Sequence, residues 1–215
     1  MRHGLLAALA LASGAAFAQG ADVGLVNLVS GEVSYAPAVG APATVKAFMK
    51  VREGDRFDVR AGAQVRVVFF ERASQERWTG PASFRATKAG SAPISGTPAE
   101  VTRLPAGVPQ RIAQVPELLQ YARLGGIQVR GGLMGQPKAS AEQLESIRAA
   151  REAYARMLGE LPADDITPEL YLYAALYEYQ RYDDMKAVVA EMRRKQPESE
   201  DVRALEAWVA ARASR

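Results

Sequence analysis

The chain has 215 residues, enough for one or two domains, and its 27 Lys and Arg residues exceed its 24 Asp and Glu residues by only 3. This balance excludes the strongly basic character of a nucleic-acid or membrane-surface protein. The chain contains no Cys, which excludes disulfides and a lipid-modified cysteine.

The N-terminus carries the pattern of an export signal. A basic start at Arg2, an apolar run from Leu5 to Ala12 and the small-residue pattern Ala16-Phe17-Ala18 follow one another. The apolar run is shorter than the roughly 20 residues that a spanning helix needs. We therefore expect residues 1–18 to be removed by a cut after Ala18 and the mature chain to be periplasmic, with full secretion as the open alternative.

The mature chain is expected to lack both imidazole and thiol groups, because the only His is His3. This excludes Ser/His/Asp and Cys/His nucleophilic catalysis and nearly all zinc sites. A carboxylate is the remaining general base, and raising the pKa of an Asp from about 3.9 to about 7 costs on the order of 4 kcal/mol. We expect a protein that is not an enzyme, with no catalytic residue, no cofactor and no metal site.

Residues 19–87 are predicted to form an all-β domain, either a sandwich or a barrel-like fold. Short apolar runs are separated by Gly31, Gly54 and Gly62, where chain reversals need a permissive backbone. The run 64–71 alternates at first and is then apolar on both sides, which predicts a central strand covered on both faces. The candidate strands are 23–28, 32–35, 56–59, 64–71 and 77–79.

Residues 88–139 are predicted to be a loop-rich connector. The stretch 88–109 is rich in Gly, Ser, Pro, Ala and Thr, which indicates a loop with one candidate strand at 100–104. A helical apolar face at 116–124 ends at Gly125-Gly126. The residues 127–130 are a candidate strand that returns to the first sheet.

Residues 140–215 show helical periodicity, so the fold class is α+β in two modules, with antiparallel helical hairpins after the β domain. The predicted N-caps are Ser140, Thr167, Asp183 and Ser199. Gln143 completes a capping box with Ser140, and Pro168 occupies the first helical position after Thr167. Pro162 and Pro197 end the first and third helices.

A set of segments within 23–87 resembles a known module. The segments are Gly31-Glu32-Val33, 51–59, 61–69 and Gly80-Pro81-Ala82-Ser83-Phe84. They are similar to a FecR-like domain, the extracytoplasmic module of ferric-citrate signalling regulators, and the resemblance implies structural turns without catalytic residues. The usual Asp-Gly-Ser turn is replaced here by Glu71-Arg72-Ala73-Ser74. A cleavable signal replaces the regulators' membrane span, so nothing would connect this domain to a cytoplasmic sigma factor.

A repeated spacing runs through the helical half. The residues Met185, Val189, Met192 and Pro197 repeat the spacing found 35 residues earlier at Ala150, Tyr154, Met157 and Pro162. This half resembles tetratricopeptide repeats, whose period is about 34, with about one and a half degenerate copies. Arrays below about three repeats seldom bury enough surface alone. We therefore expect these helices to dock on the β domain or on a second copy of the chain.

Tyrosines in the second predicted helix and just after it are the leading binding candidates. They are Tyr171, Tyr173, Tyr177, Tyr179 and Tyr182. The repeat resemblance implies a peptide-binding concave face lined by Thr167, Leu170, Ala174, Tyr177 and Glu178. Packing between helices is the commoner use of such a stripe and is the favoured interpretation of the tyrosines.

Acidic residues offer two further alternatives. Asp164-Asp165 and Asp183-Asp184 precede predicted helices, where capping accounts for them better than metal binding. The acids near predicted turns are Glu53, Asp55, Asp58 and Glu71. They are the candidate carboxylates of a glycan hydrolase, although turn chemistry accounts for the first three.

Together the patterns predict a periplasmic, non-catalytic adaptor. Its FecR-like domain would recognise an envelope component, either a protein or peptidoglycan, and its helical region would bind protein or self-associate. Nucleic acid and a membrane span after signal cleavage are not expected. The first alternative is an accessory to extracytoplasmic signalling and transcription regulation of the FecR type, and the second is a carboxylate-based glycan hydrolase.

Overall fold

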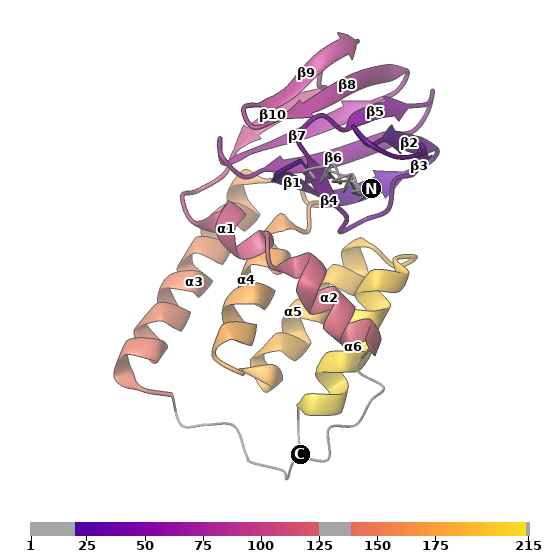
Figure 1. Ribbon diagram of the computed structural model, residues 1–215. Coiled ribbons are helices and arrows are strands. Elements are labelled where there is room, and N and C mark those ends of the chain that lie inside the picture. The colour runs from indigo at the N-terminus through magenta and orange to yellow at the C-terminus, as the bar shows by residue number, and fades with distance from the viewer. Residues whose placement is uncertain (1–19, 125–138, 214–215) are drawn as a thin grey trace, which may run out of the picture.

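A computed structural model describes residues 20–124 and 139–213 (Figure 1). A β-rich N-terminal half is followed by a helical C-terminal half, which confirms the α+β class. The predicted signal at 1–18 and the candidate strand at 127–130 lie outside the described residues. No helix in the described ranges is long and apolar enough to span a bilayer.

Ten strands of the described chain form two antiparallel sheets of five strands each. The first sheet has the order β10-β7-β6-β1-β4 and consists of β10 (Glu100–Arg103), β7 (Ser74–Thr79), β6 (Gln64–Phe69), β1 (Asp22–Ser30) and β4 (Lys50–Arg52). The second has the order β3-β2-β5-β8-β9 and consists of β3 (Ala43–Thr44), β2 (Val33–Ala36), β5 (Arg56–Val59), β8 (Ala82–Thr87) and β9 (Gly90–Ser95). The sheets pack face to face, and these strands do not close into a barrel.

Strand β6 is buried on both faces, as its sequence predicts. Val65, Val67 and Phe69 belong to the core between the two sheets. Val68 belongs to a second core shared with the helices, and Arg66 is only 1% exposed. The two faces of β6 therefore serve different neighbours, which explains why its alternating pattern ends in a run of apolar residues.

The structure corrects the loop expected from residue 88 onward. Strand β9 pairs with β8, and β10 pairs with β7, so the β region continues to Arg103. The candidate strand at 100–104 is confirmed as β10. Most side chains of β9 are exposed at the edge of its sheet, so no buried face produces a periodic pattern. Pro93 is tolerated there because an edge strand leaves some amide positions unpaired.

The predicted reversals at three glycines are confirmed by their backbone conformation. Gly31, Gly54 and Gly62 have φ values of 74°, 92° and 77°. Residues with a Cβ atom rarely adopt this left-handed region.

Six helices are present in the described chain: α1 (Val108–Ile112), α2 (Val115–Leu124), α3 (Ala141–Glu160), α4 (Thr167–Glu178), α5 (Tyr182–Lys195) and α6 (Glu200–Arg212). The caps at Ser140 and Ser199 are confirmed, since each hydroxyl accepts a backbone amide hydrogen bond three residues ahead. The other two predicted caps are wrong. Thr167 and Asp183 lie inside the first turns of α4 and α5, after the N-cap residues Ile166 and Arg181.

The helices dock on the first sheet. This confirms the expectation that they pack on the β domain, the alternative having been a second copy of the chain. A continuous apolar core links the two halves. It contains Leu25 and Val68 of that sheet, Phe48, Ile112 of α1 and Val115 of α2. Figure 1 shows α1 and α2 running across the helical half beneath the sheets. The two modules therefore share a core, and we expect them to unfold together.

Buried polar groups cross the same interface. The Asn27 side-chain amide donates to Gln75 at 2.8 Å and to the Thr167 hydroxyl at 2.6 Å. The Gln196 side-chain amide, just after α5, donates to the Asn27 carbonyl of β1 at 3.2 Å. Such groups are costly to bury unless they are paired, so they fix how the two modules fit together.

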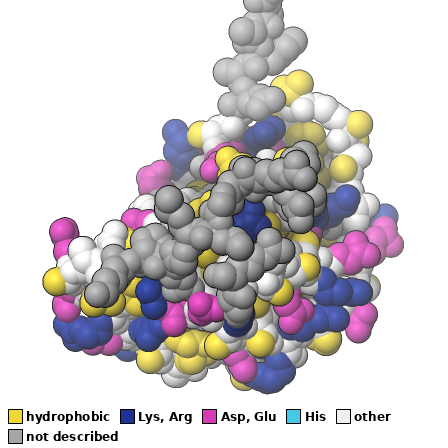
Figure 2. All heavy atoms as spheres, turned by 90° about the horizontal axis from the view of Figure 1, so that it is seen from below, with side chains coloured by type: hydrophobic (Ala, Val, Ile, Leu, Met, Phe, Trp, Pro, Cys, Tyr) yellow, Lys and Arg dark blue, Asp and Glu magenta, His cyan; other side chains and the backbone are white. Residues whose placement is uncertain are grey.

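The surface of the helical half carries mixed charge. Figure 2 shows basic and acidic side chains interspersed with apolar ones on the end farthest from the sheets. Exposed pairs include Arg148 with Glu152 at 2.7 Å and Arg194 with Glu191 at 2.9 Å. The described part of this end therefore has no large patch of only positive or only negative charge, in keeping with the near-balanced composition.

Candidate functional site

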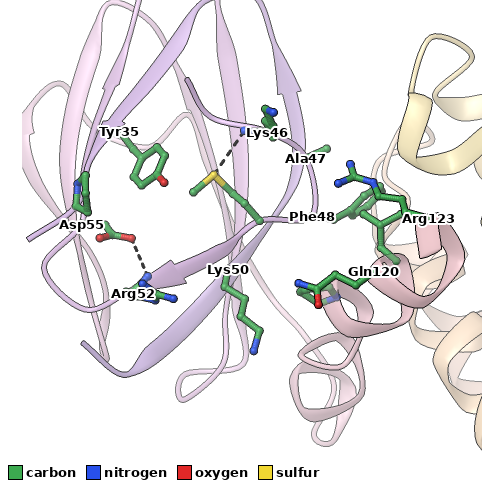
Figure 3. Close-up of a pocket in the computed structure, with 13 residues that line it drawn as sticks. Tyr35, Lys46, Ala47, Phe48, Lys50, Arg52, Asp55, Gln120 and Arg123 are labelled. Atoms are coloured by element: carbon green, nitrogen blue, oxygen red, sulfur yellow. Dashed lines mark hydrogen bonds between the residues drawn. The ribbon is translucent and has the colours of Figure 1, made fainter. Parts of the chain in front are cut away.

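A cleft of about 340 Å³ opens between the β domain and α2 (Figure 3). We call it the β–α2 cleft. One wall comes from β2 and the chain from Lys46 to Arg52, and the other comes from α2. Tyr35 and Met49 supply apolar surface on the β side, and Gln120 faces them from α2.

The connection between β3 and β4 shapes this cleft. It crosses from the edge of the second sheet to the edge of the first, and it is held there because Phe48 N donates to Val26 O at 2.7 Å and Val26 N donates to Met49 O at 3.0 Å. Phe48 has a φ of 59°, an uncommon value for a bulky residue, and its ring is 2% exposed within the core shared with the helices. Packing of this ring therefore holds the cleft wall in place.

Four cationic side chains line the cleft: Lys46, Lys50, Arg52 and Arg123. Lys50 of β4 contacts Asp22 of β1 at 3.0 Å and Glu117 of α2 at 3.3 Å, and the second contact links α2 to β4. The hydrogen bond with Asp22 raises the pKa of Lys50, which stays protonated. The ammonium group of Lys46 has no ion pair among the described residues.

Asp55 is the one acidic residue among those that line the cleft, and it is turned into the protein. It is 3% exposed, and its carboxylate accepts a hydrogen bond from Arg52 N at 2.9 Å (Figure 3). Burial raises the pKa of Asp55 above its ordinary value, and the backbone hydrogen bond opposes that shift. The exposed charge of the lining is therefore mainly positive.

The raised pKa of Asp55 predicts a pH-dependent stability difference between the wild type and Asp55→Asn. The stability that protonated Asp55 contributes is fully present below its ordinary pKa of 3.8 and is lost as the pH rises through the folded-state pKa. Urea unfolding at about pH 3 and about pH 7 should show the wild type losing stability relative to the variant at the higher pH. An unchanged or opposite difference contradicts this assignment, and the exposed Asp58→Asn is the control.

A second hollow of about 540 Å³ lies on the other side of the β3–β4 connection. It is lined by the end of β1, by the turn between α5 and α6 and by the start of α6. Lys46, Ala47 and Arg123 line both this hollow and the β–α2 cleft. The two concavities are therefore contiguous at these three residues.

The five residues predicted to line a peptide-binding face of α4 lie in mixed surroundings. Thr167, Leu170 and Ala174 are buried, with exposures of 0%, 0% and 2%, and Thr167 bonds to the β domain. Tyr177 is half-buried, and Glu178 is exposed and pairs with Arg111 of α1 at 3.7 Å. Helix α1 packs against α4 on this side. The chain's own connector thus occupies much of the surface that the repeat resemblance assigned to a peptide.

The five tyrosine side chains pack among the helices, as the favoured interpretation of their pattern predicts. Tyr173 is fully buried, and Tyr171 and Tyr179 rest partly buried against the same core. Tyr177 and Tyr182 lie against Trp208 of α6, with ring centroids 5.6 Å and 5.7 Å away. Their hydrophobic surface is therefore used within the helical half.

The acids of the hydrolase alternative lie in separate surroundings. Asp55 lines the β–α2 cleft, and the Asp58 side chain of β5 pairs with Arg56 of the same strand at 3.0 Å. Glu71 lines a different hollow beside β1, and Glu53 contacts Lys88 at 3.7 Å. Their placement gives the hydrolase alternative no support.

The aspartate pairs just before α4 and in the first turn of α5 have structural contacts. Asp165 is fully buried and accepts a hydrogen bond from Thr167 N at 2.8 Å. Asp165 therefore accepts from a free amide at the start of α4, the role that the sequence pattern had predicted for Thr167. Asp164 contacts Arg66 of β6 at 3.2 Å, and Asp184 contacts Arg151 of α3 at 3.1 Å. Within the described ranges, no group of three or more Asp, Glu, His and Cys residues has the arrangement of a metal site.

The chain has no match among family models, curated proteins or solved structures. The FecR-like and tetratricopeptide-like resemblances accordingly remain proposals.

Proposed function

We propose that this chain is a periplasmic, non-catalytic binding protein whose FecR-like β domain recognises an envelope component, either a protein or peptidoglycan. The observation that carries the proposal is the β–α2 cleft, an open concavity whose exposed charge is mainly positive. Its walls come from both modules, so docking of the helices on the β domain also builds the binding site. The helical region acts in this proposal as a support for the cleft.

The chemistry of the cleft supports binding. The polar side chains of its lining are cations, the Gln120 amide, the Tyr35 hydroxyl and one carboxylate, which accepts a hydrogen bond from Arg52 N. Cations attract negatively charged groups in a partner but supply no general base. Tyr35 and Met49 add apolar contact area beside these charges, as binding sites commonly combine the two.

A bulky substitution in the cleft tests the proposal. The chain from residue 19 onward serves as bait in envelope extracts, with crosslinking followed by identification of retained protein and murein. Gln120→Trp should lower retention of the recovered component about tenfold or more, because the indole would fill the cleft. Gln110→Trp, at an exposed glutamine of α1 outside the cleft, is the matched control.

Two outcomes would contradict the proposal. One is that the wild type retains neither protein nor murein from these extracts. The other is that Gln120→Trp and Gln110→Trp retain the same component as well as the wild type does, which would place recognition elsewhere on the molecule.

A further inference from the structure

The β–α2 cleft and the second hollow together form one elongated groove. They have volumes of about 340 Å³ and 540 Å³ and share Lys46, Ala47 and Arg123 at the β3–β4 connection. A compact ion would fill only one of them. A ligand that uses both must be a chain that passes over this junction.

The junction holds two accessible cations, Lys46 and Arg123, whereas Lys50 and Arg52, the other cations of the cleft, contact Asp22 at 3.0 Å and 3.6 Å. Lys46 is exposed and has no ion pair among the residues described, and in Figure 3 the guanidinium group of Arg123 points toward Ala47. Arg123 is 55% exposed while it contacts Asp201 on the side of the second hollow. Two accessible cations on opposite sides of a concavity suit one carboxylate, which each can hydrogen-bond.

The rest of the groove excludes a uniformly charged ligand. The exposed Glu198 and Glu200 line the second hollow, and Glu117 lies at the other end, next to Lys50. A polyanion such as a nucleic acid would meet these carboxylates at both ends. The ligand must therefore carry its negative charge at the centre and neutral or basic groups toward its ends.

Apolar surface lies on each side of the junction. The cleft contributes Tyr35, Met49 and Leu119, and the second hollow contributes Leu28 and Pro197. Aliphatic surface of this kind suits short side chains along a peptide. Sugar rings favour stacking on exposed aromatic faces. Of the two aromatic residues in the cleft lining, Phe48 is only 2% exposed, and the Tyr35 ring already stacks on Phe57 with its centroid 6.0 Å away.

We propose that the groove binds an extended peptide that has a carboxylate between Lys46 and Arg123, apolar side chains on both sides of it and basic or neutral ends. This inference rests on the proposed function and adds the class of ligand. A segment of an envelope protein offers this chemistry, whereas a murein stem peptide ends in a carboxylate that would meet the acidic residues at the ends of the groove.

Binding of defined peptides tests the inference. The probe is acetylated and amidated Lys-Val-Ala-Glu-Ala-Val-Lys, compared with the same peptide carrying Gln in place of Glu, and soluble peptides released from murein by an amidase. Binding is measured by amide shift changes in NMR titrations of the chain from residue 19 onward. The Glu peptide should bind about tenfold more tightly than the Gln peptide and shift the amides of 45–49 and 120–123.

The variants Lys46→Gln and Arg123→Gln should each weaken binding of the Glu peptide about tenfold and remove its advantage over the Gln peptide. Lys88→Gln, an exposed lysine outside the groove, should change neither. Because Lys46 has no ion pair among described residues, Lys46→Gln should also leave the midpoint of unfolding unchanged.

Equal binding of the Glu and Gln peptides, or undiminished binding by Lys46→Gln, would overturn the inference. The proposed function would survive that result if Gln120→Trp still abolished retention of an envelope component. Binding of the Glu peptide in preference to the Gln peptide supports the inference, whereas binding of the murein peptides alone would contradict it. Binding only of peptide-free glycan strands would contradict it.

Discussion

Lys195→Met should lower the free energy of unfolding by about 3–5 kcal/mol, because it leaves the buried Glu169 carboxylate without its partner. The Lys195 ammonium group contacts both Glu169 oxygens at 2.9 Å and the Asp165 carbonyl at 2.7 Å. Urea unfolding at neutral pH measures the loss. The exposed Arg194→Met, which breaks a surface pair with Glu191, should cost no more than about 1 kcal/mol.

A double variant separates loss of attraction from the cost of the buried charge. Lys195→Met with Glu169→Gln removes both charges and keeps an acceptor for the Tyr154 hydroxyl, which donates to Glu169 at 3.2 Å. It should recover most of the stability lost in the single variant. A double variant as unstable as Lys195→Met would show that the charge of Glu169 is not the source of the loss.

Phe48→Ala should lower the free energy of unfolding by about 3–5 kcal/mol through loss of a buried ring and the cavity left behind. Phe48 belongs to the core that joins the β domain to α1 and α2. The variant should also lower the affinity of the β–α2 cleft for its ligand, because packing of the ring holds the wall of that cleft in place. Val101→Ala, at a valine that is 60% exposed, should change stability by about 0.5 kcal/mol or less.

The same unfolding experiment tests whether the modules are one unit. Trp78 reports on the core between the sheets, and Trp208 lies in the core of the helices. Their fluorescence and the far-ultraviolet circular dichroism should change in one transition in the wild type. A helical transition that is complete before the β domain unfolds, with Phe48→Ala affecting only one of them, would contradict a shared core.

Elements with a strong local signal were predictable from sequence. The capping box of Ser140 and Gln143 defined the start of α3, and the pattern of Val65 to Phe69 revealed burial of β6 on both faces. These signals are local because caps act within one turn and alternation within one strand. Strand β9 lacked such a signal, since its side chains are exposed and its position is fixed by pairing with β8.

The candidate site was less predictable. The walls of the β–α2 cleft join Lys46 and Lys50 to Arg123, which is far from them in sequence and meets them only when α2 docks on the β domain. The Asn27, Gln75 and Thr167 cluster likewise depends on three distant segments, and no spacing identifies it. The face of α4 that the repeat resemblance assigned to a peptide was covered by α1, a segment outside the repeat pattern.

A crosslinking measurement tests the central claim most directly. The chain from residue 19 onward carries a photoreactive residue either in place of Gln120, inside the cleft, or in place of Ala149, exposed on α3. We predict that irradiation in envelope extracts yields one dominant adduct from position 120, lost in combination with Lys46→Gln, and none from position 149. The same adducts from both positions, or none from position 120, would contradict recognition at the β–α2 cleft.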